Sequence, residues 1–376
     1  MKNSSFYHLV LLILFFSGGC RQPYIPPAVS GNNGFLVVDG FLNIGNDSTI
    51  ITLSRSETLS DTTFSFIPEL QAQLSIIGSS SETYPLQEKG NGIYFCPQLH
   101  LNFAETYRLR ITTHNGREYI SDTIVPKQTP LIDTLTWIAD SSGLSINLNT
   151  HDPSNNTRYY RWDFTQTWQR QAYFNSELEY VNGQLIPRPA QDQIYNCWKT
   201  QSSTNIIVNT SEKLSQDIIY QQPIQFIPMG SEQLFILYSI NVRQFAITPD
   251  AYNYWQTLQS STELTGSLFD QEPSQITGNI HCLTNPTEPV LGFIGASTVS
   301  QKRIFINRND FSYWLQYPPP CFLTLVSTGD LSVFANTLLV TPVNLVPAGI
   351  NSSTPECADC RYGGDATTTE PSFWPN

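Results

Sequence analysis

The stretch 106-TYRLRITTHNGREYISDTIVP-126 decides the fold class of this chain. Tyr107, Leu109 and Ile111 alternate with charged or polar residues, which is the period of a β-strand with one buried face. Asn115-Gly116 then makes a tight turn, and β-branched and aromatic residues resume beyond it. The stretch therefore predicts an antiparallel hairpin.

Runs of the same kind cover most of the chain. The runs "GFLVVDGFLN" and "STIITLSRS" lie on either side of the turn "IGND", and Asn91-Gly92 supplies a further hairpin signal. We predict a mainly β fold with two antiparallel β-sandwich domains of the immunoglobulin-like or fibronectin-like kind. The expected bounds are residues 34–126 for an N-terminal sandwich and 130–317 for a second β-rich domain with long loops. A Pro-, Gly- and Cys-rich tail, residues 318–376, is expected to be extended, with little sheet, and to pack on the body.

One helix is expected within the second domain, near residues 249–260. Thr248 can cap its start, Pro249 suits the first helical position, and Asp250 complements the helix dipole. Further along, the runs 289–298 and 302–307 predict a final pair of strands.

Composition excludes some classes of partner. Of the 376 residues, 13% are charged and 12% aromatic, and the formal net charge is −12. The chain has no basic run, so nucleic acid and anionic lipid head groups are not expected partners. Low charge with many Thr, Ser, Asn and Tyr residues is typical of exported β-proteins.

The first nineteen residues predict a lipoprotein signal peptide. Lys2 precedes an apolar run over residues 9–16, three small residues follow, and then comes Cys20. The run is too short to span a bilayer. We expect Cys20 to carry a lipid, residues 20–33 to form a tether, and the rest of the chain to lie outside the cytoplasm. Ordinary signal cleavage with an incidental cysteine is the alternative, because Ser17 stands where a lipobox usually has leucine.

Six cysteines follow Cys20, and an exported chain meets an oxidising compartment in which thiols pair. Cys357 and Cys360 have the Cys-x-x-Cys spacing, for which a zinc knuckle, a redox switch and a disulfide are alternatives. Without a second close pair or a predicted helix start, a structural disulfide is favoured. We expect pairs of Cys197 with Cys282 and of Cys321 with Cys357 or Cys360, with Cys96 free. A tail held in this way lets Phe373 and Trp374 pack on the body.

The chain shows no nucleophile elbow, phosphate loop, zinc-protease helix or calcium loop. The stretch 151-HDPSNN-156 collects oxygen atoms that could hold Ca²⁺, but an Asx turn is favoured because few acidic ligands are present. We therefore predict no catalytic residue, no metal site and no cofactor, and a protein that is not an enzyme.

The aromatic run "RYYRWDFTQTWQ" allows more than one interpretation. On a strand, Tyr160, Trp162 and Phe164 would alternate sides with Tyr159, Arg161 and Asp163. One of the two faces could stack on sugars, as in carbohydrate-binding sandwiches. Filling of the core by Trp162 and Phe164 is favoured instead. Outward Tyr or Trp residues could also serve a protein interface.

The chain resembles the Bacteroidota outer-membrane lipoprotein family catalogued as domain of unknown function 4249. The resemblance lies in stretches such as "LVVDGFLN", "YYRWDF", "SINVRQFAITPDAYNYWQTLQ", "NPTEPVLGFIGASTVSQKRIFI" and "ECADCRYGGDATTTEPSFWP", between Phe35 and Pro375. The resemblance implies that this protein is a partner of TonB-dependent, SusC-like outer-membrane transporters. It would occupy a position similar to that of a SusD-like lid or an accessory subunit. It implies no catalytic residues.

Two details bear on the exported state. Acidic residues often follow the lipidated cysteine of surface-exported proteins in that phylum, but this chain has "CRQPYIPP", which leaves a periplasm-facing anchor open. The resemblance nevertheless favours a protein anchored in the outer membrane, on the cell surface. A short pattern similar to that phylum's O-glycosylation site occurs four times. It points to Ser48, Thr62, Thr123 and Thr134 as possible glycosylation sites.

Together these features predict a non-enzymatic lipoprotein that serves as an accessory subunit of an outer-membrane barrel complex. A surface carbohydrate-binding or adhesin module is the first alternative, and a hydrolase is the second.

Overall fold

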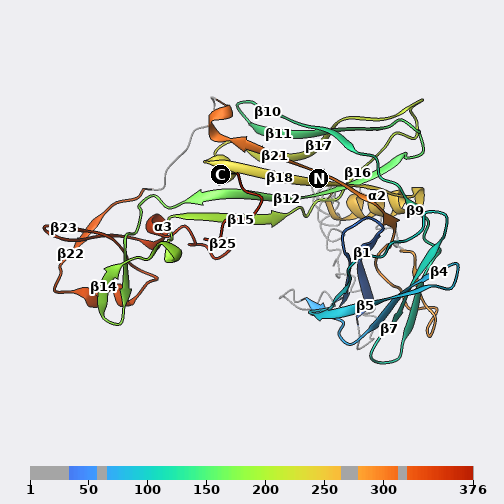
Figure 1. The fold of residues 1–376 in the computed structure, drawn as a ribbon, viewed down its shortest axis with the longest axis horizontal. Coiled ribbons are helices and arrows are strands. Elements are labelled where there is room, and N and C mark those ends of the chain that lie inside the picture. The colour runs from blue at the N-terminus through green and yellow to red at the C-terminus, as the bar shows by residue number, and fades with distance from the viewer. Residues whose placement is uncertain (1–33, 57–65, 264–277, 312–319, 376) are drawn as a thin grey trace, which may run out of the picture.

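The computed structural model describes residues 34–56, 66–263, 278–311 and 320–375. Three parts follow one another in space: a first sandwich, a second sandwich, and a smaller lobe that projects from the second on the side away from the first (Figure 1). The structure confirms the mainly β class, the two sandwiches and disulfides near the C-terminus.

The first sandwich is built from one eleven-stranded sheet that turns back on itself. Its corner lies at β5, which pairs with β4 through Thr83–Leu86 and with β6 through Gln87–Gly90. The strands are β1 (Leu36–Asn43), β2 (Thr49–Arg55), β3 (Ile67–Pro68), β4 (Gln73–Gly78), β5 (Thr83–Gly90), β6 (Ile93–Cys96), β7 (Tyr107–Thr112), β8 (Glu118–Ser121), β9 (Pro126–Lys127), β19 (Ile280–Cys282) and β20 (Ala296–Ser297).

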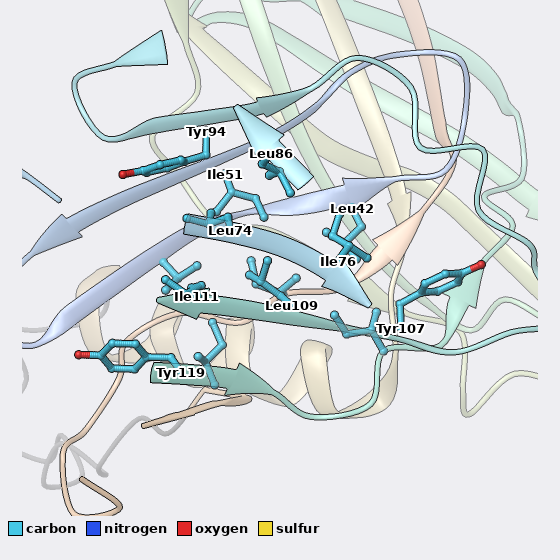
Figure 2. Packing of buried hydrophobic residues seen from close by; sticks show 14 of the residues in the cluster. Leu42, Ile51, Leu74, Ile76, Leu86, Tyr94, Tyr107, Leu109, Ile111 and Tyr119 are labelled. Atoms are coloured by element: carbon cyan, nitrogen blue, oxygen red, sulfur yellow. The ribbon is translucent and has the colours of Figure 1, made fainter. Parts of the chain in front are cut away.

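The predicted hairpin is β7–β8, and its alternation is confirmed. Tyr107, Leu109 and Ile111 are buried, whereas Arg108 and Arg110 are exposed. Figure 2 shows side chains of β4, β7 and β8 meeting those of β1 and β2 in the core. The period of two in the sequence thus fixes which face of each strand is buried.

Two strands of the first sandwich come from residues that the sequence assigned to the second domain. Strand β19 pairs with β8, and β20 lies parallel between β1 and β9. The expected pairing of the runs 289–298 and 302–307 is therefore wrong. The first run ends in β20 of the first sheet, and the second forms most of β21 (Val299–Asn307) in the second sandwich.

A buried carboxylate fixes this returning segment. The Glu288 side chain is only 6% exposed and lies 2.7 Å from Arg117 and 3.7 Å from Arg55, measured from oxygen to nitrogen. It also accepts a 2.8 Å hydrogen bond from the Tyr119 hydroxyl. Burial, together with this bond, raises the pKa of Tyr119 to about 12. Glu288 thereby joins β2 and β8 to the loop between β19 and β20.

The second sandwich packs a three-stranded sheet, in the order β10-β11-β17, on a six-stranded sheet. The larger sheet runs β21-β18-β12-β15-β25, with β16 also paired to β12. The strands not yet given are β10 (Ile132–Ala139), β11 (Gly143–Asp152), β12 (Tyr159–Gln171), β15 (Asn196–Ser202), β16 (Ile207–Thr210), β17 (Asp217–Pro228), β18 (Leu237–Ala246) and β25 (Ala366–Thr367).

The expected helix is α2 (Pro249–Glu263), three residues longer than predicted. As the sequence suggested, the Thr248 hydroxyl accepts a 3.2 Å hydrogen bond from the Ala251 backbone and caps the helix. The short helical turns of the chain are 190–192, 232–234, 308–310, 331–335 and α3 (Pro355–Ala358).

The C-terminal lobe is more ordered than a pinned tail. It contains a sheet in the order β22-β24-β23 and the hairpin β13–β14, inserted from the second domain. These strands are β13 (Leu178–Val181), β14 (Gln184–Pro187), β22 (Thr324–Val326), β23 (Thr341–Val346) and β24 (Gly349–Ser353). Phe334, which is fully buried, packs in its core with Leu178 and Ile350. The expectation of a tail with little sheet is therefore wrong.

Two disulfides tie the lobe to itself and to the second sandwich. Cys321 pairs with Cys357, as expected, and Cys197 of β15 pairs with Cys360. The expected bond from Cys197 to Cys282 is wrong, because β19 carries Cys282 into the first sandwich. Cys282 and Cys96 are buried free thiols.

The two terminal aromatic residues differ in burial. Trp374 is 8% exposed and packs edge-on against Trp198 and Phe305. Phe373 is 39% exposed, and the Arg303 guanidinium lies 3.6 Å from its ring centre. The predicted packing on the body is thus complete for Trp374 and partial for Phe373.

Peptide mapping without reductant should recover the Cys197–Cys360 and Cys321–Cys357 pairs. A Cys197→Ala/Cys360→Ala variant should lose about 2–5 kcal/mol of unfolding free energy, because the bond closes a loop of 163 residues. Cys282→Ala is the control and should lose less. A peptide linking Cys197 to Cys282 would contradict this connectivity.

Replacing the buried Glu288 by alanine should destabilise the fold by about 3 kcal/mol, since Arg117 then loses its buried partner. The matched control is Glu118→Ala, which removes the exposed pair with Arg110 and should cost less than about 1 kcal/mol. Urea unfolding followed by circular dichroism measures both. Equal losses for the two variants would show that Glu288 has no special role.

Candidate functional site

Strand β12 presents two different faces. Tyr160, Trp162 and Phe164 point into the core of the second sandwich and are at most 4% exposed. The core interpretation of these aromatic residues is therefore confirmed, and they offer no platform for a sugar. The alternate residues Arg161 and Asp163 lie on the opposite face.

The first sandwich packs against this opposite face. Phe41 of β1 meets Phe245 of β18 edge-to-face, with ring centres 4.8 Å apart. Helix α2 covers the same side, and its Trp255 ring lies 4.1 Å from the guanidinium carbon of Arg161. Aromatic residues from both sandwiches and the helix therefore surround one arginine.

A cavity of about 540 Å³ lies at this junction. Its walls come from β1, β9, β12, the end of β18, α2 and the segment 293–297. Phe41, Phe245, Trp255 and Phe293 supply apolar walls. The volume falls within the range of sites for small molecules.

Arg161 is a half-buried cation in the lining of this cavity. Burial lowers the pKa of Arg161 below its usual value, although the carboxylates of Asp163 and Asp39 oppose this effect. Asp163 is itself held by two hydrogen bonds, of 2.6 and 2.8 Å, from Arg243. Among the residues that the structure describes, the Arg161 guanidinium has ring contacts but neither a hydrogen bond nor an ion pair.

Two carboxylates and a second cation also line the cavity. The Nε2 atom of His281 lies 2.9 Å from the Oδ1 atom of Asp122. Asp250 lies in the first turn of α2. Lys127 of β9 forms no ion pair with any described residue.

The sequence analysis missed Arg161 and Lys127 as cavity residues. Their signal was weak: Arg161 alternates with core aromatic residues on a strand, and Lys127 begins the predicted linker. Neither position reveals by itself that β12 and the first sandwich meet, because the facing walls come from residues more than eighty positions away in the chain.

The possible glycosylation sites fall in different settings. Thr123 lines the cavity, is exposed and accepts a 3.2 Å hydrogen bond from Arg108. Thr134 is exposed and accepts one from Asn149, whereas Ser48 is half-buried. Thr62 and the proposed lipid attachment site Cys20 lie outside the described residues.

The stretch 151–156 forms an Asx turn. The Asp152 carboxylate accepts hydrogen bonds from the Ser154 backbone and hydroxyl and from the backbones of Asn156 and Thr157. Burial alone would raise the pKa of Asp152, but these bonds outweigh it and lower the pKa. His151 lies 2.8 Å from Asp133 instead of facing this turn. The oxygen atoms that a calcium ion would need are thus used within the turn.

The described residues contain no group of three or more His, Cys, Asp or Glu side chains that could hold a metal ion. Over the same ranges, no helix is long and apolar enough to cross a membrane.

The C-terminal lobe exposes many large apolar side chains. We call this set the lobe surface: Val181, Ile186, Phe322, Leu323, Leu325, Leu338, Leu339 and Leu345. Leu338 is 82% exposed and Phe322 is 74% exposed. Large exposed apolar areas on a soluble domain commonly mark an interaction site.

The family described as "Domain of unknown function (DUF4249)" matches residues 22–303. The matched range contains both sandwiches up to the middle of β21, and the disulfide-bonded residues of the lobe after 320 lie beyond it. No curated protein matches the chain.

The Asx turn predicts a change in stability in the acid range. Asp152→Ala should cost about 1 kcal/mol at pH 7. Because the folded-state pKa is lowered, this stabilisation is complete above the unfolded value near 3.9 and is lost as the pH falls through the folded value. Thermal unfolding from pH 7 to pH 2 measures the loss.

Asp152→Asn is the control, since it keeps an acceptor but removes the charge that titrates. Adding millimolar CaCl₂ should leave the melting temperature of the wild-type protein unchanged. A rise that Asp152→Ala abolishes would restore the calcium interpretation.

Proposed function

This chain belongs to the DUF4249 family, and from its exposed lobe surface we propose that it is a non-enzymatic accessory subunit of an outer-membrane barrel complex. The partner we propose is a TonB-dependent transporter of the SusC-like type. The protein would be held in the outer membrane by a lipid on Cys20, on the cell surface. Its role would be to dock on the rim of the barrel and help to capture or gate substrate.

The exposure of the lobe surface is the observation that carries this proposal. Covering a Leu or Phe side chain stabilises a complex by about 1.5–3 kcal/mol, so a few of these residues supply a hot spot. The lobe also projects beyond the second sandwich, where a partner can reach it without displacing either sandwich (Figure 1).

The covalent attachment of the lobe supports a docking role. The Cys197–Cys360 bond joins the lobe to β15, and the Arg170 guanidinium donates a 2.7 Å hydrogen bond to the Tyr362 carbonyl close by. A surface held in place before association loses less conformational entropy on binding. The disulfides would therefore serve the interface and not a redox reaction.

The carbohydrate-binding alternative has less support. Its stacking platform was one face of β12. The face of Tyr160, Trp162 and Phe164 is buried in the core, and Tyr159 and Arg161 on the other face contact helix α2. A hydrolase would need two acidic side chains that face each other across a cleft. Asp122 and Asp250 line the same cavity, but nothing observed for either residue supports a catalytic role.

Affinity purification from detergent-solubilised outer membrane tests the proposal. Wild-type protein should bring down a large barrel protein in near-equal amount. The double substitution Leu338→Asp/Leu339→Asp should reduce the recovered barrel at least about tenfold, because it places two charges in the apolar contact. Leu131→Asp is the matched control: Leu131 is 78% exposed but lies before β10, outside the lobe, so recovery should not change.

Peptide mapping of both disulfides checks that the variant lobe is folded. If wild-type protein is recovered alone and binds glycans on an array, the carbohydrate-binding alternative replaces the proposal. If the lobe variant recovers as much barrel protein as wild type does, the interface lies elsewhere on the protein.

A further inference from the structure

The Arg161 guanidinium is a half-buried cation that forms neither a hydrogen bond nor a close ion pair in the described part of the chain, although the carboxylates of Asp163 and Asp39 lie near enough to act on it. Its nearest acidic neighbour on β12, Asp163, is bound through both oxygens by Arg243. The guanidinium lies over the Trp255 ring, and a guanidinium that stacks on a ring still directs its N–H groups outward in its own plane. A desolvated charge without a partner is costly, so an anion that enters the cavity offsets this cost.

The other walls limit the kind of anion. Lys127 adds a second positive charge, whereas Asp122 and Asp250 add negative charge to the lining. Repulsion from these two acids grows with the charge of the ligand, so a singly charged anion is favoured over a multiply charged one. The rest of the cavity offers the rings of Phe41, Phe245 and Trp255.

We propose that the cavity between the two sandwiches binds a small organic monocarboxylate with an apolar body. The carboxylate pairs with Arg161, in the planar two-point geometry that a guanidinium favours, with Lys127 as the second cation. The apolar body packs against the aromatic walls. The site is a property of this chain and does not depend on the barrel partner proposed above.

The geometry also gives the ligand an approximate size. A cavity of about 540 Å³ suits a molecule of about ten to twenty non-hydrogen atoms. Acetate is therefore too small to use the apolar walls, and octanoate and 4-phenylbutyrate are suitable probes.

Ligand-observed NMR titrations of the purified full-length protein test the site. Octanoate or 4-phenylbutyrate should bind, and the neutral amide of the same acid should bind at least about tenfold more weakly, because it cannot pair with the cation. Arg161→Met should abolish this preference for the acid over the amide, and Arg161→Lys should keep part of it. The control is Arg303→Met, an arginine that also stacks on an aromatic ring but does not line the cavity.

Each outcome decides the matter. Binding that is equal for acid and amide, or unchanged in Arg161→Met, overturns the proposal, as does no binding of either acid at millimolar concentration. If Arg161→Met fails to fold, the comparison of acid with amide on wild-type protein and the Arg161→Lys variant still decide it. An unchanged affinity in Arg303→Met, together with a tenfold loss in Arg161→Met, supports it.

Discussion

The buried carboxylate of Glu288 fixes how the two sandwiches join. It holds the returning segment 280–297 against β2 and β8 through Arg55, Arg117 and Tyr119. That segment completes the first sheet with β19 and β20 and then leads directly into β21 of the second sandwich. Because the chain passes between the sandwiches here, the segment 293–297 becomes one wall of the cavity, and α2 is held opposite β1. The cavity is thus a consequence of this crossing.

The sequence predicts those parts of the fold whose signal is local. The alternation over residues 106–126 lies within one hairpin, and the capping of α2 by Thr248 lies within four residues, so both could be read directly. Strands β19 and β20 span three and two residues, too short for any period to appear, and their partners are far away in the chain. The three-stranded sheet of the lobe was missed for a different reason: its β23–β24 hairpin is local, but the Pro and Gly residues around it suggested an extended tail.

The candidate site depends on long-range packing, and this limits what sequence can say about it. Alternation correctly placed Arg161 opposite the core face of β12, but only the approach of β1 and α2 turns that face into a cavity wall. The cysteines show the same limit. The Cys321–Cys357 pair closes a short loop and was among the expected pairs, whereas the partner of Cys197 could not be identified without knowing that Cys282 belongs to the first sandwich.

The crossing segment also sets the order in which the molecule can be completed during synthesis or export. Until residue 296 emerges, β1 lacks its parallel neighbour β20, and β8 lacks β19, so both sides of the first sheet carry unpaired backbone groups. More than 150 residues, most of them in the second domain, separate β9 from β19 in the chain. The edges of the first sheet stay unpaired until these residues have been synthesised or exported. An incomplete sheet of this kind is prone to pair with other chains. A holding chaperone during this interval would therefore matter more for this protein than for one whose first sandwich is continuous in sequence.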